Sequence, residues 1–232
     1  MTYAILETLQ YFSWIDGFAV VLLLATWAVI GWFVDRDTPN RPSTHHLIRN
    51  YRYKWFEAAA EREVRIIDSA ILDSLRQGAS FFASASMIAI GGGAALLGQA
   101  EQLQGVAEDI TQALQAPRVV WEAKILLVIL ILTGAFLKFV WSVRLFGYCA
   151  VMLGAIPNDG TTPEAKNMAR KAAKLNIQAA RSFNRGMRTM YFALAALAWL
   201  VGAVPLILAA VATALMLYRR EFHSQSRAAL LD

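Results

Sequence analysis

The chain has 232 residues, of which 57% are hydrophobic and 17% are charged, and its formal net charge is +5 at pH 7. Soluble domains carry about a quarter charged residues, so this composition argues against a soluble globular protein and indicates an integral membrane protein. Because Cys149 is the single cysteine, the chain cannot form an intrachain disulfide.

The first part of the chain predicts two membrane spans joined by a long helical connection. Apolar stretches at about 17–34 and 79–98 each approach the 20 or so helical residues that cross a bilayer core. Between them, apolar residues recur at spacings of three and four, which predicts an amphipathic helix over about 49–76. Its apolar stripe comprises Phe56, Ala60, Val64, Ile67, Ile71 and Leu75. A neighbouring stripe carries charges spaced for ion pairs within the helix, namely Glu61, Arg65 and Asp68. We expect Asp16, at the outer end of the first span, at the level of the lipid headgroups.

The second predicted span is crowded with small residues. Pairs of them lie four positions apart, a pattern that lets helix backbones approach closely. The residues concerned are Ala89, Gly91, Gly93, Ala95 and Gly98. We expect this face to pack within the bundle, and the alternatives are a seam between copies of an oligomer or a pore lining.

The remaining chain predicts two further spans, at about 120–145 and 189–218. Between them, Thr162 before Pro and Glu is a typical helix start, and an apolar stripe follows it, so we expect a second amphipathic helix over about 163–186 that continues into the last span. Pro205 lies in the middle of that span. The span is either one long, Pro-kinked helix or a hairpin that turns near residues 202–205. We expect the single helix, because each arm of a hairpin would have only about 14 residues, roughly 21 Å.

The basic residues are concentrated in the two long connections, whereas the short connection between the second and third spans carries Glu101, Glu108, Asp109 and Arg118. Cytoplasmic connections are enriched in Lys and Arg, so both long connections are expected in the cytoplasm and the N-terminus outside. Four crossings would place the C-terminus outside as well, although Arg219, Arg220 and Arg227 follow the last span. The expected fold is all-α: one integral membrane domain over residues 1–232, with a four-helix transmembrane bundle and two long cytoplasmic amphipathic helices. The basic helix faces suit the anionic headgroups of membrane lipids.

The hydrophobic stretch over residues 125–156, which includes most of the third span, contains two permanent cations, Lys138 and Arg144. If the span begins at Trp121, Lys138 lies within a turn of the cytoplasmic boundary and its ammonium can reach the headgroups. Arg144 then lies beyond the hydrocarbon and pairs with an acid of the first amphipathic helix. The candidate charge network comprises Lys138, Arg144, Tyr148, Glu61, Glu63, Arg65 and Asp68. A span shifted toward residue 155 would instead place both cations within the bilayer, where such residues line a water path or hold an anion, with Trp141, Arg144 and Tyr148 on one face. We favour the first placement.

The sequence shows no nucleophile–base motif, no HExxH, no paired CxxC and no GxSxG. His45 and His46 lie in a Pro-containing stretch with Asp35 and Asp37 nearby, and we expect them to be solvated rather than to hold a metal. The aromatic and basic run at residues 49–55 is explained by anchoring to a lipid surface, without nucleic acid. We therefore expect no enzyme activity, no metal and no other cofactor.

Several segments, taken in order, resemble a known family. They are REVRIIDSAIL (62–72), SFFASASMIAIGG (80–92), KFVWSVRLFGYCAVMLGAIP (138–157), ARSFNRGMRTMYFALAALAW (180–199) and YRREFHSQS (218–226). Together they resemble a family of four-helix membrane proteins from bacteria and plants catalogued as domain of unknown function 599. The resemblance covers nearly the whole chain and implies a four-span topology without an established activity.

Two functions are compatible with these features. The first is a multi-pass protein of a bacterial inner membrane that acts as a non-enzymatic scaffold or accessory subunit, forming a homo-oligomer or docking to a larger membrane complex. The alternative is a small channel or transporter for an anionic solute that uses the face carrying Lys138 and Arg144.

Overall fold

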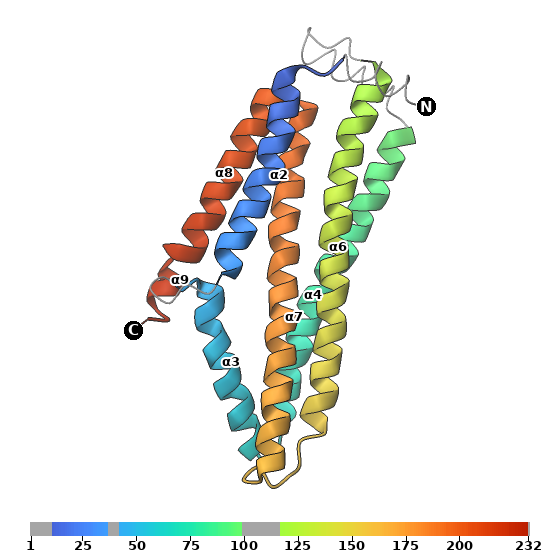
Figure 1. The fold of residues 1–232 in the computed structure, drawn as a ribbon. Coiled ribbons are helices and arrows are strands. Elements are labelled where there is room, and N and C mark those ends of the chain that lie inside the picture. The colour runs from blue at the N-terminus through green and yellow to red at the C-terminus, as the bar shows by residue number, and fades with distance from the viewer. Residues whose placement is uncertain (1–10, 37–41, 99–116, 232) are drawn as a thin grey trace. The chain divides into compact units, whose positions relative to one another are not determined.

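The structure is a computed structural model that describes residues 11–36, 42–98 and 117–231 (Figure 1). Within these ranges every regular element is a helix. The elements are α2 (Trp14–Asp35), α3 (Thr44–Glu61), α4 (Ile66–Gly98), α6 (Arg118–Gly154), α7 (Pro163–Ala196), the short 3-10 helix η1 (Leu197–Leu200), α8 (Ala203–Phe222) and α9 (Gln225–Ala228). Four of them, α2, α4, α6 and α8, are long and apolar enough to cross a membrane. This confirms the predicted all-α class with four candidate membrane-spanning helices.

The chain divides into two compact units. Unit 1 comprises Met1–Trp32, Ser86–Gly134 and Arg188–Leu217, and unit 2 comprises Phe33–Ala85, Ala135–Met187 and Tyr218–Asp232. Helices α2, α4, α6, α7 and α8 each contribute residues to both units.

Unit 1 exposes large aliphatic side chains on each of its four apolar helices. Examples are Val21 on α2, Ile88 on α4, Leu130 on α6 and Leu208 on α8. An apolar surface of this extent is unfavourable in water, because burial stabilises apolar area by roughly 25 cal/mol per Å². The exposed faces of unit 1 are therefore compatible with lipid as their surroundings.

Unit 2 has a core built from four helices. Phe56 of α3, Leu72 of α4 and Phe146 of α6 are buried there against alanines of α7, namely Ala165, Ala169, Ala172, Ala173 and Ala179. The predicted amphipathic helix over 163–186 is confirmed as part of α7. Small side chains on its buried face allow close approach, and at Gly186 a Cβ would lie 2.7 Å from the Phe139 ring.

The predicted continuous helix over 49–76 is wrong. Helix α3 ends at Glu61, Arg62 adopts an extended backbone (φ −79°, ψ 131°), and α4 begins at Ile66. Figure 1 shows α3 and α4 running in opposite directions within unit 2. The Arg65 guanidinium stabilises this break, because it donates hydrogen bonds to the carbonyls of Ala59 (2.9 Å) and Ala60 (3.2 Å) at the end of α3. The predicted apolar stripe is divided accordingly: Phe56 and Ala60 are buried, whereas Val64 and Ile67 are exposed.

The expectation of one helix over 189–218 is also wrong. Helix α7 ends at Ala196, η1 follows, and the chain turns at Gly202, whose positive φ of 157° suits a residue without a side chain. Helix α8 then runs back in the direction opposite to α7 within unit 1 (Figure 1). The arms of this hairpin are longer than the roughly 21 Å expected from the sequence. The 20 residues of α8 span about 30 Å, and the other arm is the continuation of α7. Pro205 lies in the first turn of α8, where its missing N–H has no partner to lose.

The hairpin changes the position of the C-terminal segment. In unit 2 the Thr44 hydroxyl donates to the Glu221 carbonyl at 3.0 Å, and Arg227 Nε donates to the Pro42 carbonyl at 3.1 Å. The end of α8 and Arg227 after it therefore lie beside the first basic connection. The basic residues of the C-terminal segment are thus grouped with those of that connection, as the enrichment of Lys and Arg on one side of a membrane requires.

Candidate functional site

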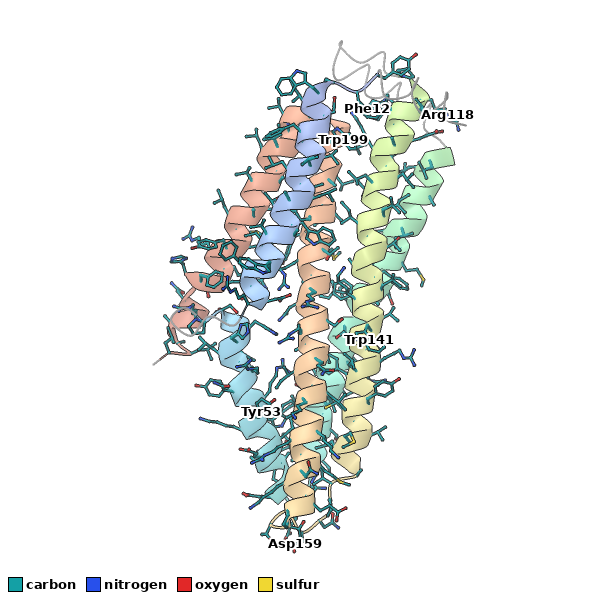
Figure 2. All side chains as sticks on the ribbon, in the orientation of Figure 1. Phe12, Tyr53, Arg118, Trp141, Asp159 and Trp199 are labelled. Carbon is teal, nitrogen blue, oxygen red and sulfur yellow. The ribbon has the colours of Figure 1, made fainter. Side chains whose placement is uncertain are left out.

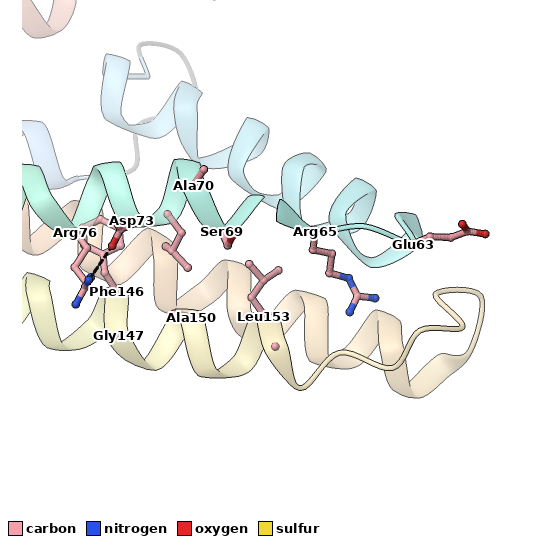
Figure 3. Close-up of a pocket in the computed structure, with 12 residues that line it drawn as sticks. Glu63, Arg65, Ser69, Ala70, Asp73, Arg76, Phe146, Gly147, Ala150 and Leu153 are labelled. Carbon is pink, nitrogen blue, oxygen red and sulfur yellow. Dashed lines mark hydrogen bonds and ion pairs between the residues drawn. The ribbon is translucent and has the colours of Figure 1, made fainter. Parts of the chain in front are cut away.

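A groove of about 850 Å³ lies between α4 and α6 in unit 2 (Figure 3). Small residues line much of it, namely Ser69, Ala70, Gly147, Ala150 and Gly154, and the larger Leu72, Phe146 and Leu153 lie among them. Charged side chains also line it: Glu63, Arg65, Asp73 and Arg76. The groove therefore combines an apolar, small-residue floor with charges of both signs, which is a surface suited to a helix.

The charged residues of the groove are positioned by local contacts. Arg76 Nη2 lies 2.8 Å from Asp73 Oδ1, one turn away on α4. Arg65 donates from Nη1 to the Ile156 carbonyl (2.7 Å) and from Nη2 to the Pro157 carbonyl (2.8 Å), in addition to its contacts with the end of α3. Arg65 therefore joins the ends of three helices, which gives this predicted site residue a structural role.

Asp68 is the buried charge of this region. Its side chain has no exposed surface. The carboxylate accepts a hydrogen bond from Trp55 Nε1 at 2.7 Å and forms an ion pair with Arg62. Trp55 and Arg62 belong to α3 and the turn after it, whereas Asp68 lies in the first turn of α4. The carboxylate thus ties the two helices together at the point where the chain reverses.

The predicted pairing of Arg144 with Glu61, Glu63 or Asp68 is wrong. Arg144 Nη2 instead donates to the Tyr148 hydroxyl at 3.0 Å, and its guanidinium carbon lies 5.9 Å from the centre of that ring. Trp141 is also exposed, and its position three residues before Arg144 places it on the same face of α6. Lys138 is half-buried, and its carbonyl accepts a hydrogen bond from Ser182 Oγ at 2.7 Å. The residues predicted as one network therefore lie in separate places: Arg144 and Tyr148 outward on α6, and Asp68 buried between α3 and α4.

Exposed apolar side chains flank the groove. Val64, Ile66, Ile67 and Ile71 project at the start of α4, with Ile66 72% exposed, and Val151 projects from α6 with 72% exposed. In unit 2, where the sequence predicts cytoplasmic helices, exposed aliphatic side chains of this kind are typical of surfaces that contact another molecule.

The small-residue face of α4 is mostly open. Of the three glycines among the five predicted residues, Gly93 has a close neighbour, because a Cβ there would lie 2.9 Å from Ile129 Cγ1, whereas a Cβ at Gly91 or Gly98 would meet nothing within 4 Å. Ala89, Gly91, Ala95 and Gly98 are exposed. Intrachain packing therefore accounts for one member of this face, and the alternative of a seam between copies stays a prediction.

A buried cation in unit 1 was not identified from the sequence. Lys124 of α6 is 5% exposed, and its ammonium lies 5.3 Å from the Trp121 ring and 5.8 Å from the Trp199 ring. Trp199 Nε1 donates to Asp16 Oδ1 at 2.8 Å, and the Trp199 ring also contacts Phe12 (Figure 2). Asp16 is thus a partner in a cluster rather than only a headgroup-level residue. The sequence signal that could have identified it was a lysine three residues after Trp121, at the start of a long apolar run.

The paired histidines are not solvated as expected. His46 is 4% exposed and shares a hydrogen bond with Ser43 Oγ at 2.9 Å, and His45 Nδ1 lies 3.1 Å from Asn184 Nδ2. Among the residues that the structure describes, no three His, Cys, Asp or Glu side chains converge as metal ligands would.

Comparison with known proteins finds one family. A family model described as "Protein of unknown function, DUF599" matches residues 18–226 of the chain. No curated protein and no solved structure matches it.

Proposed function

Because the chain belongs to the DUF599 family of proteins of unknown function, we propose its role from its own geometry. The protein is an integral membrane protein that acts as a non-enzymatic scaffold or accessory subunit, and unit 2 docks to a second copy through the groove between α4 and α6. The observation that carries this proposal is the small-residue groove flanked by exposed aliphatic side chains.

The groove is suited to a second copy in two respects. The exposed side chains at the start of α4 are aliphatic projections that a small-residue floor can receive, and burying one isoleucine contributes about 1.5–3 kcal/mol. The charges that line the groove also balance, because two acids, Glu63 and Asp73, and two arginines, Arg65 and Arg76, are among the lining residues. A surface with both signs can pair with itself across a twofold axis, where each residue meets its complement on the other copy.

Substitution of Gly147 by leucine is expected to abolish the dimer. A Cβ at this position meets nothing within 4 Å, so the side chain projects into the groove without disturbing the fold. Light scattering of the protein in mild detergent should show half the wild-type protein mass. Gly78 is the matched control, because it also has nothing within 4 Å of its Cβ and does not line the groove. A wild-type protein that is monomeric without a co-purifying partner, or a Gly147→Leu dimer, would contradict the proposal.

The proposed setting is a bacterial inner membrane, crossed with the N-terminus outside and both basic connections and the C-terminus in the cytoplasm. The contacts that join the C-terminal segment to the first basic connection support this orientation. The exposed Trp141 and Tyr148, with Arg144 between them, suit the cytoplasmic headgroup region, where aromatic and basic side chains are enriched.

This orientation predicts that a cysteine in place of Lys174, which is exposed on α7, stays unlabelled when a membrane-impermeant maleimide is added to intact spheroplasts. It should react once detergent is added. Glu122→Cys near the start of α6 is the control and should react from outside, while the native Cys149 is fully buried. Labelling of the Lys174→Cys variant in intact spheroplasts would reverse the orientation.

The alternative function, an anion channel or transporter, needs Lys138 and Arg144 along a hydrated path. Arg144 and Tyr148 lie on an exposed face of α6 and bond to each other. That position favours anchoring at the headgroups over lining an interior path, so we prefer the scaffold.

A further inference from the structure

A second cavity in unit 2, of about 340 Å³, is bounded by α3, α7 and the segment from α8 to α9. Its lining is mostly polar, and the side chains that matter here are His45, Arg52, Asn184, Arg220, Glu221 and Ser226. The cavity lies near the ends of two apolar helices, because Ser43 Oγ donates to the Val34 carbonyl at the end of α2 (3.2 Å) and Thr44 donates to the Glu221 carbonyl at the end of α8.

Arg52 is the central group of this cavity. Among the described residues, its guanidinium forms one hydrogen bond, to the neutral Asn176 Oδ1, and no ion pair. Burial lowers the pKa of Arg52 below its ordinary value, because desolvation disfavours the charged form. A guanidinium has five N–H donors, so most of those of Arg52 remain available toward the cavity.

A second arginine, Arg181 of α7, is a neighbour in sequence of residues that line the cavity. It follows Ala180 and precedes Asn184 by three residues, and both Ala180 and Asn184 are lining residues. Within the described part of the chain, the Nε of Arg181 is buried without a hydrogen-bond partner. Two arginines on facing helices thus have donors that the protein itself does not satisfy.

The charges at the cavity sum to a positive value. Arg52 and Arg220 are cationic, Glu221 is the acid among the lining residues, and His45 bonds to the Asn184 amide. Hydroxyl donors such as that of Ser226 complete the lining. Arginine binds phosphate through paired, charge-assisted hydrogen bonds, and such bonds are roughly twice as strong as neutral ones.

We propose that this cavity binds a phosphate group, carried either by an anionic lipid headgroup or by a soluble phosphate ester. The anion supplies acceptors for the half-buried guanidinium of Arg52 and offsets the net positive charge. The site is separate from the groove between α4 and α6 and does not depend on dimer formation.

The test uses the full chain in detergent and two probes, phosphatidylglycerol and inorganic phosphate. Bound lipid is counted by native mass spectrometry, and phosphate binding is followed by the shift in thermal unfolding. Arg220→Gln removes a cation of the cavity, and Ser226→Leu places an aliphatic side chain in it from an exposed position on α9. Each is expected to weaken binding about tenfold. Arg170→Gln, an exposed arginine outside this cavity, is the matched control and should bind as wild type.

The site is assigned to a lipid headgroup if the wild type binds phosphatidylglycerol, both variants weaken that binding, and inorganic phosphate does not shift thermal unfolding. A thermal shift with inorganic phosphate that the same variants lose assigns it to a soluble phosphate ester. Arg52→Gln should abolish the bound-lipid signal or the thermal shift, whichever the wild type shows. Arg52 also bonds to Asn176, so if this variant fails to fold, the binding measured for Arg220→Gln and Ser226→Leu decides the test. Equal binding of both probes by wild type, Arg220→Gln and Ser226→Leu, or no binding by wild type, overturns the proposal.

Discussion

Substitution of Arg62 by methionine is expected to lower the free energy of unfolding by about 3 kcal/mol. Asp68 has no exposed surface, and among the described residues its side chain is bonded to Arg62 and to Trp55 Nε1. Methionine keeps the aliphatic stem but removes the counter-charge, so the carboxylate is left buried with a single neutral donor. Denaturant unfolding in detergent, followed by tryptophan fluorescence, measures the change.

Two controls separate this effect from the general loss of an arginine. Arg76→Met breaks the pair with Asp73, in which both side chains are about half exposed (51% and 45%), and an exposed pair of this kind contributes about 1 kcal/mol or less. Adding Asp68→Asn to Arg62→Met should recover part of the lost stability, because the neutral amide is less costly to bury and still accepts from Trp55. Equal losses for Arg62→Met and Arg76→Met would show that Asp68 does not depend on Arg62.

Substitution of Gly160 by alanine is expected to destabilise unit 2 by about 3 kcal/mol or to prevent folding. A Cβ there would lie 2.7 Å from the Ala60 carbonyl carbon and 2.9 Å from Glu61 Cα, and it would approach the Ala60 oxygen still more closely. These are backbone atoms at the end of α3, so a rotamer change cannot relieve the clash. The thermal unfolding midpoint and the yield of folded protein are the measurements.

Gly78→Ala is the matched control, because it lies within α4 with nothing within 4 Å of its Cβ. Alanine stabilises a helix interior by about 0.8–1 kcal/mol relative to glycine, so this variant should unfold at the wild-type midpoint or above it. A Gly160→Ala protein as stable as Gly78→Ala would mean that the connection between α6 and α7 does not pack against the end of α3.

For the predicted residues of the candidate site, relations within one helix were predicted correctly and contacts between helices were not. That Trp141, Arg144 and Tyr148 share one face of a helix was predicted correctly, because that relation depends only on helical spacing. The partners were not: Arg144 contacts Tyr148 on its own helix, and Asp68 contacts Trp55 across the turn after α3. A carboxylate and a guanidinium can pair at many separations in a sequence, and only the fold selects among them.

The groove between α4 and α6 was only partly foreseen. Glu63 and Arg65 were candidates because they are charged. Gly147, Ala150 and Gly154 form the floor of a groove only because α6 lies beside α4, which the sequence does not reveal. The cluster of Lys124 with Trp121, Trp199 and Asp16 was missed for the same reason, because its members come from α2, α6 and η1.

The sequence by itself determined the helical class and the candidate spans α2, α4 and α6, because hydropathy and helical periodicity are properties of a few consecutive turns. The tertiary structure decided where the chain reverses. Arg65 reaches the carbonyls of Ile156 and Pro157, about ninety residues later, and the C-terminal segment bonds to residues near the start of α3. Such contacts join distant parts of the chain, and they turned one predicted cytoplasmic helix into α3 and the first part of α4 and one predicted span into the α7–α8 hairpin.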